Sequence, residues 1–159
     1  GCILITLLAE LPRAGGVGID KSLPALELAR ANAESLGVGD RARFMAGDWL
    51  EADQETFDLV VAKPPYLSAA DMAGLSNEVG AHDPRDALFG GVDGLSAYRR
   101  IVPRLGKVLR PGGIALFEIA HTQAEAVSGF LAEAGLVLEQ GPWRDLAGRP
   151  RVVGGRAHG

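Results

Sequence analysis

Short apolar runs typical of strands alternate with segments of helical period along this chain, and this alternation constrains the fold more than any other feature. The predicted strands cover residues 17–20, 43–46, 57–62, 114–119, 136–140 and 151–153. The predicted helices cover residues 3–11, 22–36, 95–109 and 123–134. This order indicates an α/β fold around a parallel sheet, with the last two strands forming a closing hairpin.

Local signals set the ends of several elements. Ser22 is a good N-cap, and Pro24 suits the first turn of the helix that Gly37 ends. Residues 110–113, Arg-Pro-Gly-Gly, are expected to stop the helix before them. The helix at 3–11 is apolar on nearly every face and is expected to be buried. Residues between 67 and 93 are polar and rich in glycine, and we expect them to be irregular.

The composition fits one ordinary domain. The chain has 159 residues, of which 47% are apolar, and a formal charge of −4, which argues against broad contact with nucleic acid. Cys2 is the single cysteine, expected to be buried, and predicts a reducing, cytoplasmic compartment. No run approaches the roughly 20 apolar residues of a membrane span. The three histidines, His82, His121 and His158, lack ligand-like spacing, so no metal is expected.

Polar residues follow several predicted strands, where parallel sheets bind their ligands. Asp20 could accept both hydroxyls of a ribose, or it could cap the helix that follows. Asp48 could accept from an adenine amino group while Trp49 covers the ring; the alternative is a loop acid beside a core tryptophan. Glu118 could face a ligand pocket or bond to loop backbone.

The turn Lys63-Pro64-Pro65-Tyr66 follows the apolar strand at 57–62. Neither proline has an N–H to donate, so the strand cannot continue through them. The prolines stiffen the turn and hold its carbonyl groups in fixed directions, and the Tyr66 ring can pack on a flat group. Such a turn suits the orientation of a planar amide or amine, although a plain strand-ending turn is the alternative.

This turn resembles the Asn-Pro-Pro-Tyr motif of enzymes that methylate amino groups. Further likeness lies in residues 78–79, 83–88, 90–95, 98–101, 109–113, 117–119 and 145–149. Together these runs are similar to the HemK/PrmC type of protein-glutamine methyltransferase. The resemblance implies a class I, Rossmann-like fold that uses S-adenosylmethionine. It also implies that the substrate is the glutamine of the Gly-Gly-Gln loop in peptide chain release factors, methylated at its side-chain nitrogen.

The resemblance implies roles for individual residues as well. Asp20 corresponds to the cofactor-binding acid, and Asp48 and Trp49 to the pair beside the adenine. Gly1 corresponds to the end of the glycine-rich cofactor loop, and residues 63–66 to the turn that orients the substrate amide. An amide nitrogen is a poor nucleophile, so alignment with the methyl group can supply much of the acceleration.

The sequence departs from the family pattern in two places. Residues 1–4 match the end of the cofactor loop, so we expect residues 1–159 to be a partial catalytic domain. The family's first strand, most of its glycine loop and its preceding helical substrate-binding domain are then absent, and the isolated chain is expected to fold poorly and bind cofactor weakly. Lys63 stands where the family has asparagine. Lysine has three donors and no acceptor, so reduced methylation is expected.

Two other functions remain open: an amino-methyltransferase that acts on a ribosomal-protein glutamine or a DNA adenine, and a chain of this family without turnover. The expected partner is a release factor, with no direct nucleic acid and no membrane, and the chain is expected to be a monomer. Glu78 and Arg85 are expected to form an ion pair in the long loop. Four late arginines are interpreted as solvated surface rather than an RNA-binding patch: Arg144, Arg149, Arg151 and Arg156.

Overall fold

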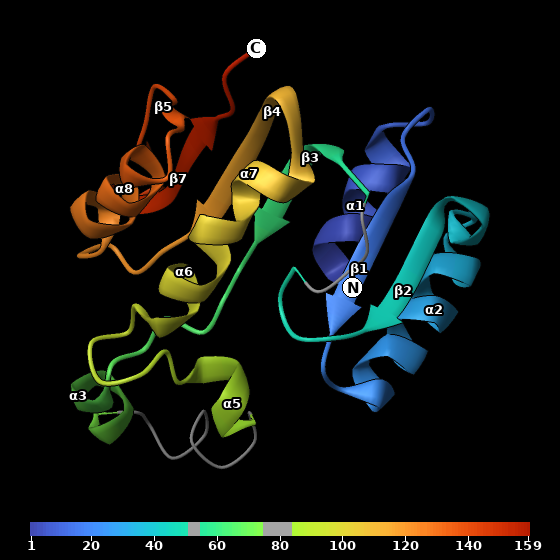
Figure 1. Ribbon diagram of the computed structural model, residues 1–159. Helices are drawn as coiled ribbons and strands as arrows, with labels where there is room; N and C mark the ends of the chain where they lie inside the picture. The colour runs from blue at the N-terminus through green and yellow to red at the C-terminus, as the bar shows by residue number, and fades with distance from the viewer. Residues whose placement is uncertain (51–54, 75–83) are drawn as a thin grey trace. The chain divides into compact units, whose positions relative to one another are not determined.

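The computed structural model describes residues 1–50, 55–74 and 84–159, and the chain forms two compact units, Gly1–Glu55 and Thr56–Gly159. The first unit, blue to cyan in Figure 1, contains α1 (Cys2–Glu10), β1 (Gly16–Asp20), α2 (Leu23–Ser35), η1 (Gly39–Arg41) and β2 (Ala42–Ala46). β1 and β2 are parallel, and both helices pack on this strand pair. The predicted order of helices and strands is confirmed here.

Helix signals in the first unit act as the sequence predicts. The Ser22 hydroxyl accepts from the backbone N–H of Ala25 at 3.3 Å, and Gly37 adopts φ +67° after α2. The expectation that the first helix is buried all round is wrong, because only Ile5 and Leu8 of α1 are buried. Two strands and one helix cover a single side of α1, which leaves its other side exposed. Cys2 lies on an exposed position too, contrary to the prediction.

The second unit is built on a mixed sheet. Its strands are β3 (Phe57–Ala62), β4 (Leu109–Glu118), β5 (Val137–Leu138), β6 (Trp143–Arg144) and β7 (Pro150–Arg156). The order is β3-β4-β7-β5, and β6 also pairs with β7. β3 and β4 are parallel, whereas β7 is antiparallel to β4, β5 and β6. The predicted closing hairpin is thus a β5–β7 pair with β6 added beside it.

Helices cover the sheet of the second unit. They are α3 (Ala69–Ala73), α5 (Arg85–Leu88), α6 (Ser96–Ile101), η2 (Val102–Arg104), α7 (Leu105–Val108) and α8 (Ala124–Glu133). α8 packs on β7, α7 packs on β4 and α6 contacts α8, and Figure 1 shows these three helices on one face of the sheet. Ala115, Phe117 and Ile119 are fully buried at alternate positions of the β4 segment, as expected for one covered face.

Two predictions for the second unit are wrong. The helix expected at 95–109 is divided into α6, η2 and α7, because Pro103 cannot donate a backbone hydrogen bond and a 3₁₀ turn forms around it. Residues 110–113, expected to be a plain stop, lie within β4. There the pairing with β3 shifts register between Phe57 and Leu59, and Gly112 adopts φ +75°.

The irregular stretch expected at 67–93 is irregular only in part. Its described residues contain α3 and α5, and Leu67 forms a parallel bridge with Phe89. Ser68 and Asp71 form a capping box at the start of α3. None of the helices in the described part of the chain is long and apolar enough to cross a membrane.

Candidate functional site

The Pro-Pro turn follows β3 directly and lines a small pocket. Pro64 is fully buried, Pro65 and Tyr66 are half-buried, and the Lys63 side chain is exposed. The pocket has a volume of about 60 Å³, and its wall is completed by Leu67 and two residues of α5, Ala87 and Leu88. One water needs about 10–15 Å³ of such space, so the pocket has room for a small group such as a carboxamide with its three heavy atoms.

Glu118 lies beside the turn because β3 and β4 end at the same edge of the sheet, with Ala62 opposite Phe117. The Tyr66 hydroxyl donates to Glu118 Oε1 over 3.4 Å. Burial raises the pKa of the Tyr66 hydroxyl, and the Glu118 carboxylate raises it further. Glu118 therefore faces the turn with its carboxylate.

A buried tyrosine holds the backbone of Glu118. The Tyr98 hydroxyl donates to the Glu118 carbonyl at 2.7 Å, and burial raises the pKa of Tyr98. Tyr98 is fully buried and packs edge-on against Phe117, with 6.0 Å between ring centroids. This core tyrosine fixes the end of β4 next to the turn.

Lys63 places its charge beside the tyrosine of the same turn. Lys63 Nζ lies 5.7 Å from the centroid of the Tyr66 ring, a separation at which a cation and an aromatic face attract. An ammonium group donates hydrogen bonds and accepts none. The side chain at this position therefore adds a positive charge to the turn and no acceptor.

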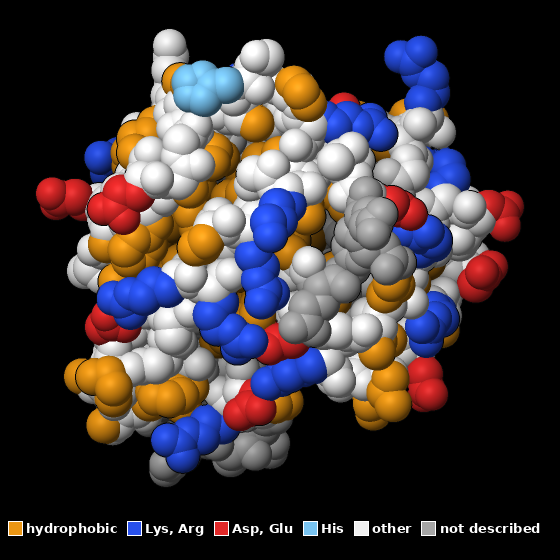
Figure 2. All heavy atoms as spheres, in the orientation of Figure 1, with side chains coloured by type: hydrophobic (Ala, Val, Ile, Leu, Met, Phe, Trp, Pro, Cys, Tyr) orange, Lys and Arg blue, Asp and Glu red, His pale blue; other side chains and the backbone are white. Residues whose placement is uncertain are grey.

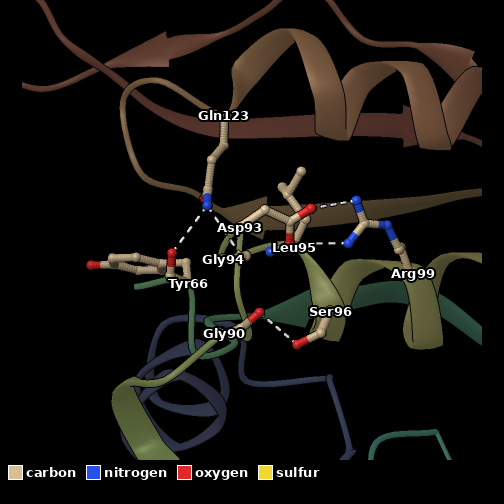
Figure 3. Close-up of polar contacts among 8 residues, drawn as sticks. All are labelled: Tyr66, Gly90, Asp93, Gly94, Leu95, Ser96, Arg99 and Gln123. Atoms are coloured by element: carbon tan, nitrogen blue, oxygen red, sulfur yellow. Dashed lines mark hydrogen bonds and ion pairs between the residues drawn. The ribbon is translucent and has the colours of Figure 1, made fainter. Parts of the chain in front are cut away.

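Sequence reasoning missed Gln123, which contacts the turn from the residue before α8. Gln123 Nε2 donates to the carbonyl groups of Tyr66 and Gly94, at 3.0 and 3.1 Å, and Figure 3 shows the side chain pointing at both. Gly94 adopts φ +74°, a conformation that favours glycine. In the sequence, the Asp93-Gly94 pair is typical of a turn, and no local pattern marks Gln123 as its partner.

The candidate cofactor residues lie in the first unit, at the carboxyl ends of β1 and β2. Asp20 pairs with Ala46 in register, and the Gly47 N–H donates to the Asp20 carbonyl at 3.2 Å. The parallel pairing thus brings Asp20 to the same edge as the Asp48-Trp49 pair. The Asp20 side chain is exposed, and its Oδ1 accepts from the Ser22 N–H at 2.9 Å, whereas the N-cap of α2 is Ser22 itself.

Trp49 is the most unusual residue of this edge. It is the one non-glycine residue with positive φ among those described, at +58°. Its indole Nε1 is buried and has no hydrogen-bond partner within the described parts of the chain. Buried indole N–H groups normally have a partner. The residues at this edge therefore offer one exposed carboxylate and one unpaired donor.

Gly1 lies where α1 approaches α2. Its carbonyl accepts from the Ile5 N–H at 3.1 Å, and an added Cβ would lie 2.5 Å from the Ala29 Cβ. Only glycine permits this close approach, so the residue has a packing reason besides the cofactor role that the resemblance implies.

Two further candidate residues lie outside the described part of the chain. The Arg85 guanidinium lies 5.4 Å from the Phe89 ring centroid, whereas Glu78 and His82 lie outside the described residues, so their roles stay predictions. Within residues 1–50, 55–74 and 84–159 no three His, Cys, Asp or Glu side chains form a group suited to a metal ion.

Three of the late arginines make local contacts. Arg144 donates to the Gly148 carbonyl, Arg151 pairs with Asp145 at 2.9 Å, and Arg156 pairs with Glu139 at 2.8 Å. Figure 2 shows Lys and Arg side chains over the region of α6 and α7 with Asp and Glu side chains among them. The late arginines thus take part in the ordinary surface bonding of the C-terminal segment.

Comparison with known proteins places these observations in a family. A family model described as a methyltransferase domain matches residues 1–134. The chain is 47% identical over 156 residues to the release factor glutamine methyltransferase of Bradyrhizobium diazoefficiens, an alignment that covers 98% of this chain and 52% of the relative. The chain therefore belongs to the methyltransferase domain family. The resemblance to the HemK/PrmC type is confirmed.

Solved structures show the same fold. A methyltransferase from Pyrococcus furiosus matches with a TM-score of 0.71 at 12% identity, over 99% of this chain and 70% of that one. An RNA methyltransferase from Salinibacter ruber, solved in complex with S-adenosyl-L-homocysteine, matches with a TM-score of 0.60 at 21% identity, over 99% and 74%. The predicted class I fold is confirmed, and with it S-adenosylmethionine as the methyl donor of the class.

The chain spans about half the length of the curated relatives it matches.

Proposed function

We propose that this chain carries the catalytic part of a protein-glutamine methyltransferase. Its substrate is the glutamine side chain of the Gly-Gly-Gln loop in peptide chain release factors, and S-adenosylmethionine is the methyl donor. The observation that carries the proposal is the rigid Pro64-Pro65 turn beside a pocket of carboxamide size, in a chain whose relatives bear that activity in their name.

In this proposal the turn orients the substrate amide. The Tyr66 carbonyl is engaged by Gln123, so one acceptor for the amide N–H groups is the earlier carbonyl of Pro64, and the second would come from the side chain at position 63, which lysine cannot supply. The half-buried Tyr66 ring packs on the flat face of the amide, and the Glu118 carboxylate beside it favours the N–H side of the group. Holding both N–H groups in fixed acceptors turns the nitrogen lone pair toward the methyl group.

When bound, S-adenosylmethionine supplies a methyl group on a positively charged sulfur, which is a good electrophile. We assign its ribose hydroxyls to Asp20 and its adenine to Asp48 and Trp49. The chemistry of these residues fits the group: a carboxylate accepts hydroxyl hydrogens, and the unpaired Trp49 N–H needs an acceptor. Gly1 is assigned to the cofactor side as well, because the resemblance places it at the end of the glycine-rich cofactor loop.

The main test measures methyl transfer from labelled S-adenosylmethionine to a purified release factor. The release factor glutamine methyltransferase of Bradyrhizobium diazoefficiens serves as the positive control, because the chain covers 52% of that relative's length. A release factor with Gln replaced by Ala in Gly-Gly-Gln is the substrate control. Transfer by the chain that depends on this glutamine supports the proposal. Transfer to the Ala form, or no transfer by the chain under conditions in which the relative is active, contradicts it.

Lys63→Asn is the variant that tests the turn. Asparagine provides an acceptor and removes the charge next to Tyr66, and one hydrogen bond is worth about 0.5–1.5 kcal/mol. We expect methyl transfer to rise by about tenfold. Lys107→Asn, at an exposed position of α7, is the matched control and should leave the rate unchanged. A Lys63→Asn rate equal to that of the parent contradicts the role of position 63.

The second candidate is a chain of this family without turnover, and Lys63 is the observation that favours it. Such a chain still binds S-adenosylhomocysteine or a release factor but transfers no methyl group. Calorimetric binding alongside the transfer assay separates the two candidates, and recovery of transfer by Lys63→Asn shows that the residue causes the loss.

A further inference from the structure

Apart from tyrosine, Gln123 carries the one polar side chain that is buried within the described residues, at 8% exposure. It lies at the N-cap position of α8, and its side chain accepts no capping bond from that helix. A buried carboxamide normally needs its hydrogen bonds satisfied. A buried glutamine at this place therefore has a purpose other than helix capping.

The amide of Gln123 is bonded at both ends. Nε2 donates to the carbonyls of Tyr66 and Gly94, and Oε1 accepts from the Ala120 N–H at 3.0 Å. The two carbonyl oxygens can accept only from the NH₂ group of the Gln123 amide, and the Ala120 N–H can donate only to the amide oxygen. The surroundings thus allow a single orientation of this side chain, and neither Glu nor an apolar residue reproduces it.

The loop at 90–94 closes against the turn from the same side. An added Cβ at Gly90 would lie 2.6 Å from the Pro65 carbonyl oxygen, and one at Gly94 would overlap the Tyr66 carbonyl. Ser96 holds Gly90 in place, since its hydroxyl and its N–H both donate to the Gly90 carbonyl, at 2.5 and 2.9 Å.

The other end of this loop is held by charge. Asp93 and Arg99 form a bidentate ion pair at 3.0 and 2.6 Å, and Asp93 also accepts from the Leu95 N–H at 3.1 Å. Figure 3 shows this pair on one side of Gly94 and the Gln123 amide on the other. The residues on either side of Gly94 are therefore held in place by bonds that do not involve Gln123.

The bond from Gln123 leaves the backbone of the turn little conformational freedom. The prolines fix their own φ angles, and a bond to the Tyr66 carbonyl fixes the peptide plane that follows Tyr66. We propose that Gln123 is a positioning residue: its side-chain amide joins Tyr66, Gly94 and Ala120 and sets the direction in which the turn presents the acceptor amide. This role rests on the proposed function.

Gln123→Glu tests the role through pH. The introduced carboxyl would lie against two carbonyls in a buried place, which raises its pKa. Ionised, it has no donor; protonated, it can donate one of the two lost bonds. Methyl transfer should fall about a hundredfold at about pH 8.5 and recover in part at about pH 6, with the KM for S-adenosylmethionine unchanged. Gln140→Glu, at an exposed position, should show neither effect.

Gln123→Met keeps the shape and removes the amide, so it should lose transfer at every pH without recovery. A second readout does not depend on activity. The chain has two tyrosines, and burial raises the pKa of Tyr66, so ultraviolet titration should show this pKa falling toward its ordinary value in Gln123→Met. Near-ultraviolet circular dichroism confirms that each variant is folded.

The outcomes are distinguishable. Parental transfer and an unchanged Tyr66 titration in folded Gln123→Met would overturn the positioning role. A rise in the KM for S-adenosylmethionine in Gln123→Glu would also overturn it. If the parent transfers no methyl group at all, the proposed function fails, and the Tyr66 titration alone then decides whether Gln123 orders the turn.

Discussion

The two sets of candidate residues are held in different ways. In the second unit, the turn at 63–66 is braced by long-range bonds, since Gln123 reaches Tyr66 across 57 positions and Gly94 across 29. In the first unit, the side-chain bond of Asp20 is local, to Ser22 two residues away, and the indole N–H of Trp49 has no partner among the described residues.

This difference indicates that the two sets meet different demands. The acceptor turn must hold one nitrogen in one direction, so its geometry is completed within the fold before any substrate arrives. At the strand ends of the first unit, the Asp20 carboxylate makes a local bond and the Trp49 indole N–H has no partner among the described residues, as expected for groups that can exchange protein bonds for ligand bonds. Variants of the turn and of the candidate cofactor residues test this difference, and the largest effect is expected at the turn.

Gly94→Ala tests the braced turn. A methyl group at Gly94 would overlap the Tyr66 carbonyl and lie 2.6 Å from Gln123 Nε2, so one of these groups must move. We expect methyl transfer to fall about a hundredfold, the scale that a displacement of about 1 Å in a positioned group can cause. The measurement is the initial rate at saturating S-adenosylmethionine.

Gly112→Ala is the matched control for that variant. Gly112 has nearly the same φ, +75° against +74°, but an added Cβ there meets no atom within 4 Å. It should lower the free energy of unfolding by about 1–2 kcal/mol through left-handed strain alone and leave transfer unchanged. Equal losses of transfer in the two variants would show that strain, and not the contact with the turn, limits activity.

Trp49→Phe tests the candidate cofactor residues of the first unit. Phenylalanine keeps an aromatic ring and removes the unpaired N–H, so the free chain should lose little stability from the missing bond. The Kd for S-adenosylhomocysteine should rise by about tenfold, the value of one hydrogen bond of about 1.4 kcal/mol. Isothermal calorimetry measures this. Trp143→Phe, on a partly exposed tryptophan of β6, should leave the Kd unchanged.

The Trp49 variant also decides between the two interpretations of that residue. A lower melting temperature with an unchanged Kd would mean that Trp49 is a core residue of the first unit and no part of a cofactor site.

The sequence allowed the order of strands and helices and the position of the turn to be predicted, because period, caps and proline are local features. Ser22 and Gly37 act as predicted. Pro103 was also visible in the sequence, but the apolar period around it masked its effect on the helix. Gln123 could not be predicted, since its purpose depends on two carbonyls far away in the chain, and no local pattern marks which side chains the fold brings together.

The smallest effect is expected from Asp93→Asn, which loosens the loop that carries Gly94. The Arg99 guanidinium and the Leu95 N–H lower the pKa of Asp93 to about 2 in the folded chain, from an ordinary value of 3.8. A carboxyl with a lowered pKa stabilises the fold above its unfolded value, and that contribution is lost as pH falls through the folded value. The stability difference between parent and variant should therefore be present at neutral pH and vanish between about pH 4 and about pH 2.

Asp145→Asn is the matched control for the pH dependence of Asp93→Asn. Bonds to the Arg149 N–H and the Arg151 guanidinium also lower the pKa of Asp145, but these partners belong to the segment around β6 and β7. In acid titrations of the melting temperature, the difference from the parent should shrink for both variants as pH falls, because each variant removes one carboxylate with a lowered pKa. Only Asp93→Asn should also slow methyl transfer at neutral pH, because only Asp93 holds the loop that meets Gln123. Equal rates in the two variants would mean that the ion pair stabilises the unit without ordering the turn, and the brace would then be Gln123 alone.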